Sequence, residues 1–296
     1  LSVLRLSGSL PVHPCLALTL SGFGRVSEYV GADGGSLATT GLDGTTFALE
    51  IPPGALTGAQ LITMTPVDAV ADLPMAGGFV AAVDLQPSGL RFWTPATLTI
   101  EPVSTVPPED QVAFIINEGE FALTPVLVDS EAIEMPLTHF STPGVGSGPA
   151  GSVPPPSSPT AAYAARVAQI LAAQRTAALL GQPGDPDYLD RIAEIMQEQF
   201  VNSVSPDLMA AASDCKVAAR AIPEAFGFAR QAELLGLGPQ FVTQVQSLMA
   251  GIEPALQNCR EEAFDRCVQQ HDLAAISDIV GYSRSRSYSY DQAGQA

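Results

Sequence analysis

The chain contains almost no lysine and few basic residues of any kind. Lys216 is the one lysine among 296 residues, and 31 Asp and Glu residues outnumber the 13 Lys and Arg residues. The resulting net charge of −18 repels the phosphates of nucleic acids and the surfaces of anionic membranes. We therefore expect no nucleic-acid partner, and we interpret the dispersed acidic residues as a solvated surface.

Long apolar runs are lacking too, since no stretch of 18 or more apolar residues occurs. The sequence therefore predicts no membrane-spanning helix. Residues 1–23 are interpreted either as an N-terminal extension that keeps the remnant of an export signal or as a first β-strand. Pro11, His13 and Pro14 interrupt the apolar part of this segment, which argues against the signal.

Common motifs of enzymes and metal sites are absent. The chain has no GxSxG turn, no phosphate-binding P-loop and no HExxH pair. It has three histidines, His13, His139 and His271, and no CxxC pair, so a structural zinc site is not expected. We expect no cofactor, no metal and, apart from cleavage of its own backbone, no enzymatic activity.

Four cysteines, Cys15, Cys215, Cys259 and Cys267, occur in a chain that is rich in acidic residues, proline and glycine. This usage is typical of an oxidising compartment. In one continuous helix Cys259 and Cys267 would lie about 12 Å apart along the axis, which is too far for a bridge between them. Cys215 is therefore expected to pair with Cys259 or with Cys267, and four buried free thiols are the alternative.

Short alternating segments fill residues 24–142. Thr46–Ile51 places Phe47, Leu49 and Ile51 on one face, and Pro52 follows the segment. Turn residues separate further segments of this kind, which is typical of a β-sandwich or a barrel. The other predicted strands are residues 61–67, 78–85, 96–100, 111–117, 121–128 and 132–140.

The second half of the chain changes to helical spacing. Residues 143–159 consist almost entirely of Gly, Pro and Ser, and they are interpreted as a flexible linker between two independently moving domains. Residues 160–282 predict an all-α domain of helical hairpins, and residues 283–296 a disordered tail. The predicted fold class is thus a multidomain protein, with an antiparallel β-sandwich followed by a helical bundle. Arg175 and Arg230 could bind an anion, but ion pairs within helices explain them more simply.

Several pieces of residues 31–142 together resemble the ZU-five family of β-domains. They are Gly34-Gly35, Asp43-Gly44, the segment IPPGAL at residues 51–56, the strand ITMTPV at residues 62–67, and the triplet His139-Phe140-Ser141. The copy is similar to those in exported bacterial proteins, which implies a β-sandwich that sits beside unrelated modules. The helical half lies outside this resemblance.

The resemblance also implies a possible reaction, because some members of the family cut their own backbone at the sequence HFS. Ser141 would then attack the carbonyl carbon of Phe140, with His139 as the base. The alternative is structural. Residues 133, 135, 137 and 139 share one face of a strand, so His139 would point into the core, and Ser141 would end the strand. The Gly- and Pro-rich residues after Ser141 also argue against cleavage, since they are not expected to pair in a sheet and hold the product.

These observations favour a non-catalytic, exported interaction or scaffold protein of the cell surface or envelope, with a protein partner that the sequence does not identify. Self-processing between Phe140 and Ser141 is the alternative function.

Overall fold

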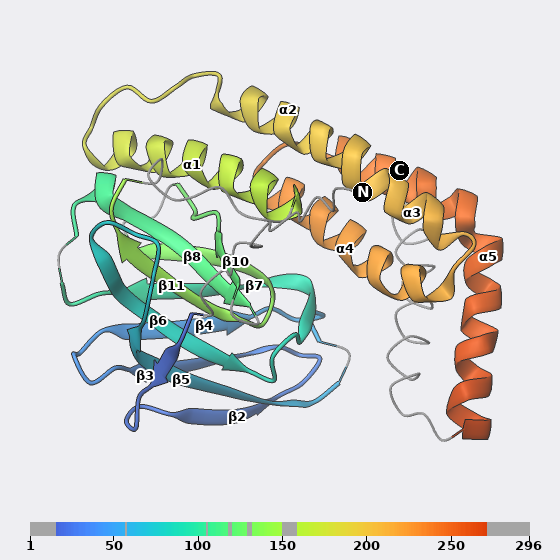
Figure 1. Cartoon of the computed structure of the whole chain (residues 1–296), viewed down its shortest axis with the longest axis horizontal. Helices are drawn as coiled ribbons and strands as arrows, with labels where there is room; N and C mark the ends of the chain where they lie inside the picture. Colours follow the sequence, from blue (N-terminus) through green and yellow to red (C-terminus); the bar gives the residue numbers. More distant parts are fainter. Residues whose placement is uncertain are drawn as a thin grey trace, which may run out of the picture.

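A computed structural model describes residues 16–270 of the chain, apart from residues 57, 105, 118–119, 129–131 and 150–158. Cys15, the last predicted helix from Asp272 and the predicted tail lie outside the described residues. Antiparallel strands occupy the N-terminal part and helices the C-terminal part (Figure 1). The β-then-α order of the chain is confirmed.

The described strands form two antiparallel sheets. One is a seven-stranded sheet in the order β1-β5-β6-β11-β8-β9, in which β2 also pairs with β5, and the other is a four-stranded sheet in the order β10-β7-β4-β3. The bounds of the strands are β1 Leu18–Leu20, β2 Val26–Val30, β3 Gly35–Thr40, β4 Thr46–Ile51, β5 Gln60–Val70, β6 Gly78–Gln86, β7 Arg91–Glu101, β8 Gln111–Asn117, β9 Glu120–Leu123, β10 Ile133–His139 and β11 Thr142–Ser147.

The two sheets share a core that their alternating sequences build. In β4 the side chains of Phe47, Leu49 and Ile51 are buried while the residues between them are exposed. They pack in one cluster with residues of the other sheet, among them Ile62 of β5 and Leu85 of β6. The period-2 pattern of β4 therefore places its apolar side chains against those of the other sheet.

β11 contradicts the prediction that a linker begins at residue 143. Residues Thr142–Ser147 form a strand that pairs with β6 on one side and β8 on the other. Its glycines allow the neighbouring strands β6 and β8 to approach closely. A Cβ on Gly144 would lie 2.6 Å from Ala82 Cβ and 2.6 Å from Phe114 Cζ. The composition that suggested a flexible linker is thus a packing requirement inside the sheet.

The helices follow at α1 Pro159–Leu179, α2 Tyr188–Gln199, a π-helical turn η3 Phe200–Val204, α3 Ser205–Ala211, α4 Cys215–Leu234 and α5 Gln240–Gln270. A short 3-10 turn, η1 Pro108–Asp110, precedes β8. α4 runs on through Pro223 and α5 through Pro254. Among the helices in the described residues, none is long and apolar enough to cross a membrane.

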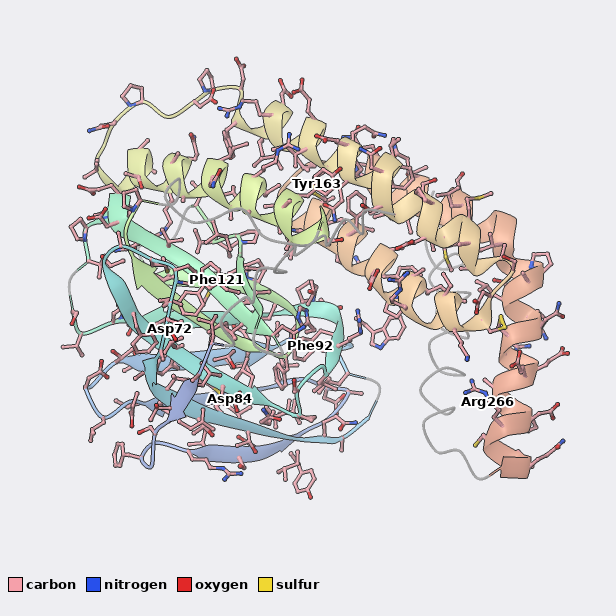
Figure 2. All side chains as sticks on the ribbon, viewed as in Figure 1. Asp72, Asp84, Phe92, Phe121, Tyr163 and Arg266 are labelled. Carbon is pink, nitrogen blue, oxygen red and sulfur yellow. A yellow bond between two sulfur atoms is a disulfide. The ribbon has the colours of Figure 1, made fainter. Side chains whose placement is uncertain are left out.

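The helical half packs directly on the sheets, which corrects the prediction of two independently moving domains. α1 lies between the sheets and α2 (Figure 1). Ala165 and Ala168 of α1 pack with Phe121 of β9, whereas Tyr163 and Val167 belong to the core of the helical half. Phe121, on the side of the sheets, and Tyr163, in α1, are both labelled in Figure 2. α1 therefore contributes to two cores at once.

A buried arginine joins the same two parts of the chain. Arg175 of α1 is 3% exposed, and its Nη1 donates a 2.6 Å hydrogen bond to Oε1 of Gln111 at the start of β8. Its Nη2 donates a 3.3 Å bond to the carbonyl of Ala132. The hydroxyl of the next residue, Thr176, donates to the carbonyl of Pro108 at 3.2 Å. Arg175 is thus an interface residue, whereas Arg230 pairs with Glu233 on its own helix.

Candidate functional site

His139, Phe140 and Ser141 lie where the chain crosses from one sheet to the other. β10 ends at His139 in the four-stranded sheet, and β11 begins at Thr142 in the seven-stranded sheet. Phe140 is fully buried in the shared core and makes an edge-on contact with Phe92, with ring centroids 5.0 Å apart. The predicted HFS triplet is therefore the crossover that links the two sheets.

His139 does not point into the core beside Met135 and Leu137, as its position on the strand predicted. The pairing of β10 with β7 shifts register between Leu137, opposite Ala96, and His139, opposite Arg91. A shift of this kind turns the following side chain away from its regular face. Leu137 remains in the core, whereas His139 lines a cavity outside it.

The environment of His139 favours a neutral imidazole. Burial lowers the pKa of His139 below its usual value, and the nearby charge of Arg91 lowers it further. The hydroxyl of Thr138 lies 3.4 Å from Nδ1 of the ring. At neutral pH the ring can therefore accept a proton, as a base must.

Ser141 is buried at 5% exposure, and its Oγ has no hydrogen-bond partner among the described residues. It therefore makes no hydrogen bond to His139. One backbone donor holds the peptide group between Phe140 and Ser141: the Gly89 N–H donates to the Phe140 carbonyl oxygen at 3.1 Å. The Leu85 N–H donates to the carbonyl oxygen of the next peptide group, that of Ser141, at 3.2 Å. The structure thus places a buried hydroxyl beside a firmly held peptide, without a base in contact with it.

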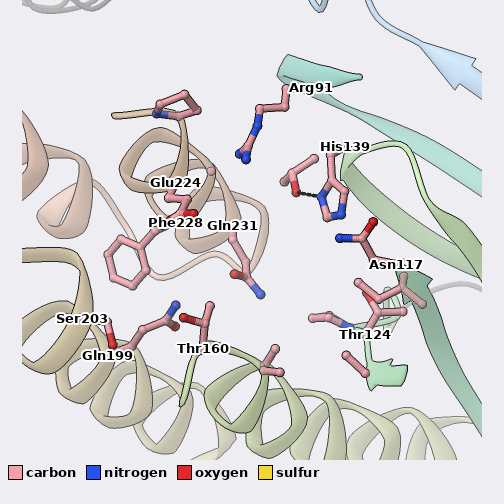
Figure 3. Close-up of a pocket in the computed structure, with 18 of the residues that line it drawn as sticks. Arg91, Asn117, Thr124, His139, Thr160, Gln199, Ser203, Glu224, Phe228 and Gln231 are labelled. Atoms are coloured by element: carbon pink, nitrogen blue, oxygen red, sulfur yellow. Dashed lines mark hydrogen bonds between the residues drawn. The ribbon is translucent and has the colours of Figure 1, made fainter. Parts of the chain in front are cut away.

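The cavity that His139 lines has a volume of about 600 Å³ and lies between the sheets and the helices. Figure 3 shows Arg91 and His139 on the sheet side, and Glu224 and Gln231 of α4 on the helical side. Asn117, at the end of β8, adds an amide. The wall is therefore polar on both sides and is built by residues more than 80 positions apart in the sequence.

Opposite charges face the cavity from the two walls. Arg91 lies at the start of β7, and Glu224 follows Pro223 in α4; both side chains are exposed. Within the described part of the chain neither of them forms an ion pair. Asp207, a third charged residue of the wall, lies 3.5 Å from Arg220.

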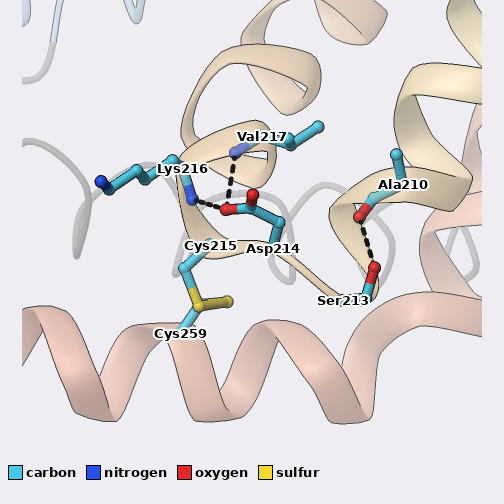
Figure 4. Close-up of a disulfide and its surroundings, with 7 residues drawn as sticks. All are labelled: Ala210, Ser213, Asp214, Cys215, Lys216, Val217 and Cys259. Carbon is cyan, nitrogen blue, oxygen red and sulfur yellow. Dashed lines mark hydrogen bonds between the residues drawn. A yellow bond between two sulfur atoms is a disulfide. The ribbon is translucent and has the colours of Figure 1, made fainter.

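A disulfide ties the helices together, as the cysteine spacing predicted. Cys215 and Cys259 join the start of α4 to the middle of α5, with Cα atoms 5.3 Å apart (Figure 4). Asp214 caps α4, and its side chain accepts hydrogen bonds from the N–H groups of Lys216 and Val217. Cys267 is a free, half-buried thiol.

Neither a metal-binding cluster among the described residues nor a known protein family accounts for the cavity and the buried hydroxyl of Ser141. Among the described residues no group of three or more His, Cys, Asp or Glu side chains could hold a metal ion. No protein-family model matches the chain, and no curated protein matches it either.

The cavity, its charged pair and the buried arginine were not predicted from the sequence. The sequence suggested an anion site or a helix ion pair for Arg175, yet this side chain donates hydrogen bonds to Gln111 and to the carbonyl of Ala132. Arg91 and Glu224 are separated by 132 intervening residues, and no local pattern connects them. The one available signal was Pro223, a helix-interior proline that here lies in the cavity wall.

Proposed function

We propose that this protein is an exported, non-catalytic interaction protein whose N-terminal half is a ZU-five-like β-sandwich. The disulfide between Cys215 and Cys259 supports export, because such bonds persist in oxidising compartments. The lack of a hydrogen bond between Ser141 and a base supports a non-catalytic role. The buried contacts of Arg175 support a scaffold in which sheets and helices form one unit.

The observation that carries the interaction role is an apolar pair on the outer face of the seven-stranded sheet. Tyr29 of β2 and Leu61 of β5 lie directly opposite each other, and their side chains are 73% and 47% exposed. Ser27 and Thr63 continue this face with a 2.8 Å hydroxyl–hydroxyl contact. Tyrosine is enriched at protein interfaces, and here an exposed tyrosine lies directly beside an exposed leucine.

Site-specific photocrosslinking in the native cells tests this role. A benzophenone amino acid at Tyr29 is expected to give a discrete crosslinked adduct, whereas the same group at Thr46, exposed on the four-stranded sheet, is expected to give none. Acid-quenched cells, treated with a thiol-alkylating reagent, are expected to show Cys215 and Cys259 oxidised. Reduced cysteines would contradict export, and equal crosslinking at Tyr29 and Thr46 would contradict the interaction face.

Self-cleavage between Phe140 and Ser141 is a second candidate, which β11 specifically favours. Because β11 pairs with strands on both sides, a chain cut before Ser141 would stay in the sheet. The argument that the following residues could not hold the product is therefore removed. The Gly89 N–H is a donor that could stabilise negative charge on the Phe140 oxygen.

The reaction would need Ser141 Oγ to bond to the carbonyl carbon of Phe140 while the peptide C–N bond breaks. His139 would take the hydroxyl proton and give it to the freed amine, and water would then hydrolyse the ester. Intact-mass measurement separates the candidates. The non-catalytic role predicts one species of 30.7 kDa. Fragments 1–140 and 141–296, lost in Ser141→Ala but kept in the exposed control Ser36→Ala, would establish cleavage instead.

A further inference from the structure

The cavity between the sheets and the helices has the features of a built binding site. Its volume of about 600 Å³ falls within the range of small-molecule sites in proteins. Its wall combines amide groups from Asn117 and Gln231 with apolar surface from Phe121 and Phe228. A ligand there would meet both hydrogen-bonding groups and apolar side chains.

Three backbone irregularities meet at this one cavity. The register shift before His139 turns its ring into the cavity. The π-helical turn η3 begins immediately after Gln199 and contains Ser203, and both residues line the wall. Pro223, inside α4, lines it as well. Bulges and π-turns carry a cost in regular pairing, and they occur frequently at functional sites.

The charges of the wall define the ligand. Arg91 on the sheet side and Glu224 on the helical side are both without an ion pair in the described part of the chain. A purely anionic ligand would meet the carboxylate of Glu224, and a purely cationic one the guanidinium of Arg91. A ligand with one charge of each sign would complement both walls.

We propose that this cavity binds a short peptide with free ends, its carboxylate against Arg91 and its ammonium group against Glu224. The amides of Asn117 and Gln231 each offer a donor and an acceptor, as a peptide group requires. His139 adds a neutral ring rather than a second positive charge, because burial lowers its pKa. Asp207 is already close to Arg220, which leaves Glu224 as the carboxylate available to the ammonium group.

Binding of the tripeptide Ala-Ala-Ala to the full chain tests the proposal. Calorimetric titration with peptide up to about 10 mM detects even a millimolar dissociation constant. The C-terminal amide and the N-acetyl form of the same tripeptide each lack one charge. We expect each blocked form to bind at least tenfold more weakly than the free tripeptide, because a charge-assisted hydrogen bond is lost.

Two variants assign the two ends of the peptide. Arg91→Gln should bind the tripeptide at least tenfold more weakly and should no longer distinguish it from its amide. Glu224→Gln should lose the distinction between the tripeptide and its N-acetyl form. Both side chains are exposed, so thermal unfolding should be unchanged. Arg25→Gln and Glu28→Gln, exposed residues in or beside β2, are the matched controls and should bind as the wild type does.

The outcomes are distinguishable. Tripeptide binding that both end groups control, each through its own residue, establishes the site. Absence of binding at about 10 mM overturns the proposal. So does equal binding of the blocked and free forms, or binding of acetate as tight as that of the tripeptide, which would indicate a simple anion site. None of these results depends on cleavage at Ser141 or on the face around Tyr29.

Discussion

Arg175 of α1 and Gln111 of β8, which are 64 residues apart in the chain, form a 2.6 Å hydrogen bond at the junction of sheets and helices. Arg175 is 3% exposed, and two of its acceptors are the side-chain oxygen of Gln111 and the carbonyl oxygen of Ala132. Burial lowers the pKa of Arg175 from its usual value, but an arginine stays charged in a protein. The junction therefore depends on acceptors that stabilise a buried positive charge.

Removing the Gln111 acceptor should lower the stability of the protein more than removing the charged Arg175 side chain. Gln111→Leu is expected to lower the free energy of unfolding by about 2–3 kcal/mol, because the buried guanidinium loses its 2.6 Å acceptor. Arg175→Met should lower the free energy of unfolding by less than Gln111→Leu does, since it leaves no buried charge behind. The double variant should cost less than the sum of the two. Urea unfolding measures all three. Arg166→Met is the control: its ion pair with Glu198 is exposed, so a change below about 1 kcal/mol is expected. Additive costs would contradict the coupling.

The disulfide should stabilise the helical half mainly by restricting the unfolded chain. Cys215 and Cys259 are 44 residues apart, and closing a loop of this length is worth about 4 kcal/mol in the chain-entropy model. The variant with both cysteines changed to serine should lose roughly that amount in denaturant unfolding. Cys267→Ser, at the free and half-buried cysteine, should change stability by less than about 1 kcal/mol. A larger effect at Cys267 than at the pair would contradict the bond.

Regular elements were predictable where one face is buried and the other is exposed. The alternation of Thr46–Ile51 predicted β4 with its bounds, and the turn residues on both sides of Gln111–Asn117 did so for β8. The predicted start of the helical half at residue 160 lies within one residue of the start of α1, and Gly181, with a φ of +64°, follows the end of this helix closely. In these segments local chemistry and tertiary packing favour the same structure.

β11 was not predictable in this way, because its composition reflects its neighbours. Gly144 and Gly146 have no side chain that could reveal the alternation of a strand. Each is a glycine because another segment of the protein packs closely against it. The same is true of His139, whose outward direction depends on where β10 pairs with β7. The cavity that His139 lines is built from both the sheets and the helices, so it became visible only when the two were placed together.

Alanine at Gly144 should test the role of glycine in β11 directly. The new Cβ would lie within 2.7 Å of the side chain of Ala82, the ring of Phe114 and the carbonyl of Ala81, closer than real Cβ atoms approach. We expect a loss of about 1–3 kcal/mol in unfolding free energy, the usual cost of overpacking. Gly227→Ala is the matched control, because Gly227 lies inside α4 with nothing within 4 Å of its Cβ position. It should gain up to about 1 kcal/mol from helix propensity. Equal effects at the two glycines would show that residues 142–147 are not packed as a central strand.

The burial of His139 should appear as a pH dependence of stability. Its pKa is lower in the folded protein than in the unfolded chain, where it is about 6.5. Below that value the unfolded chain binds the extra proton, so the contribution of the neutral ring is complete above about pH 7.5 and is lost as the pH falls through 6.5. The wild type should therefore lose more stability than His139→Gln between pH 7.5 and 5.5, a range in which most carboxylates stay charged. Thermal unfolding of both proteins across this range measures the difference, and parallel profiles would show that the ring is solvated and not held in the cavity wall.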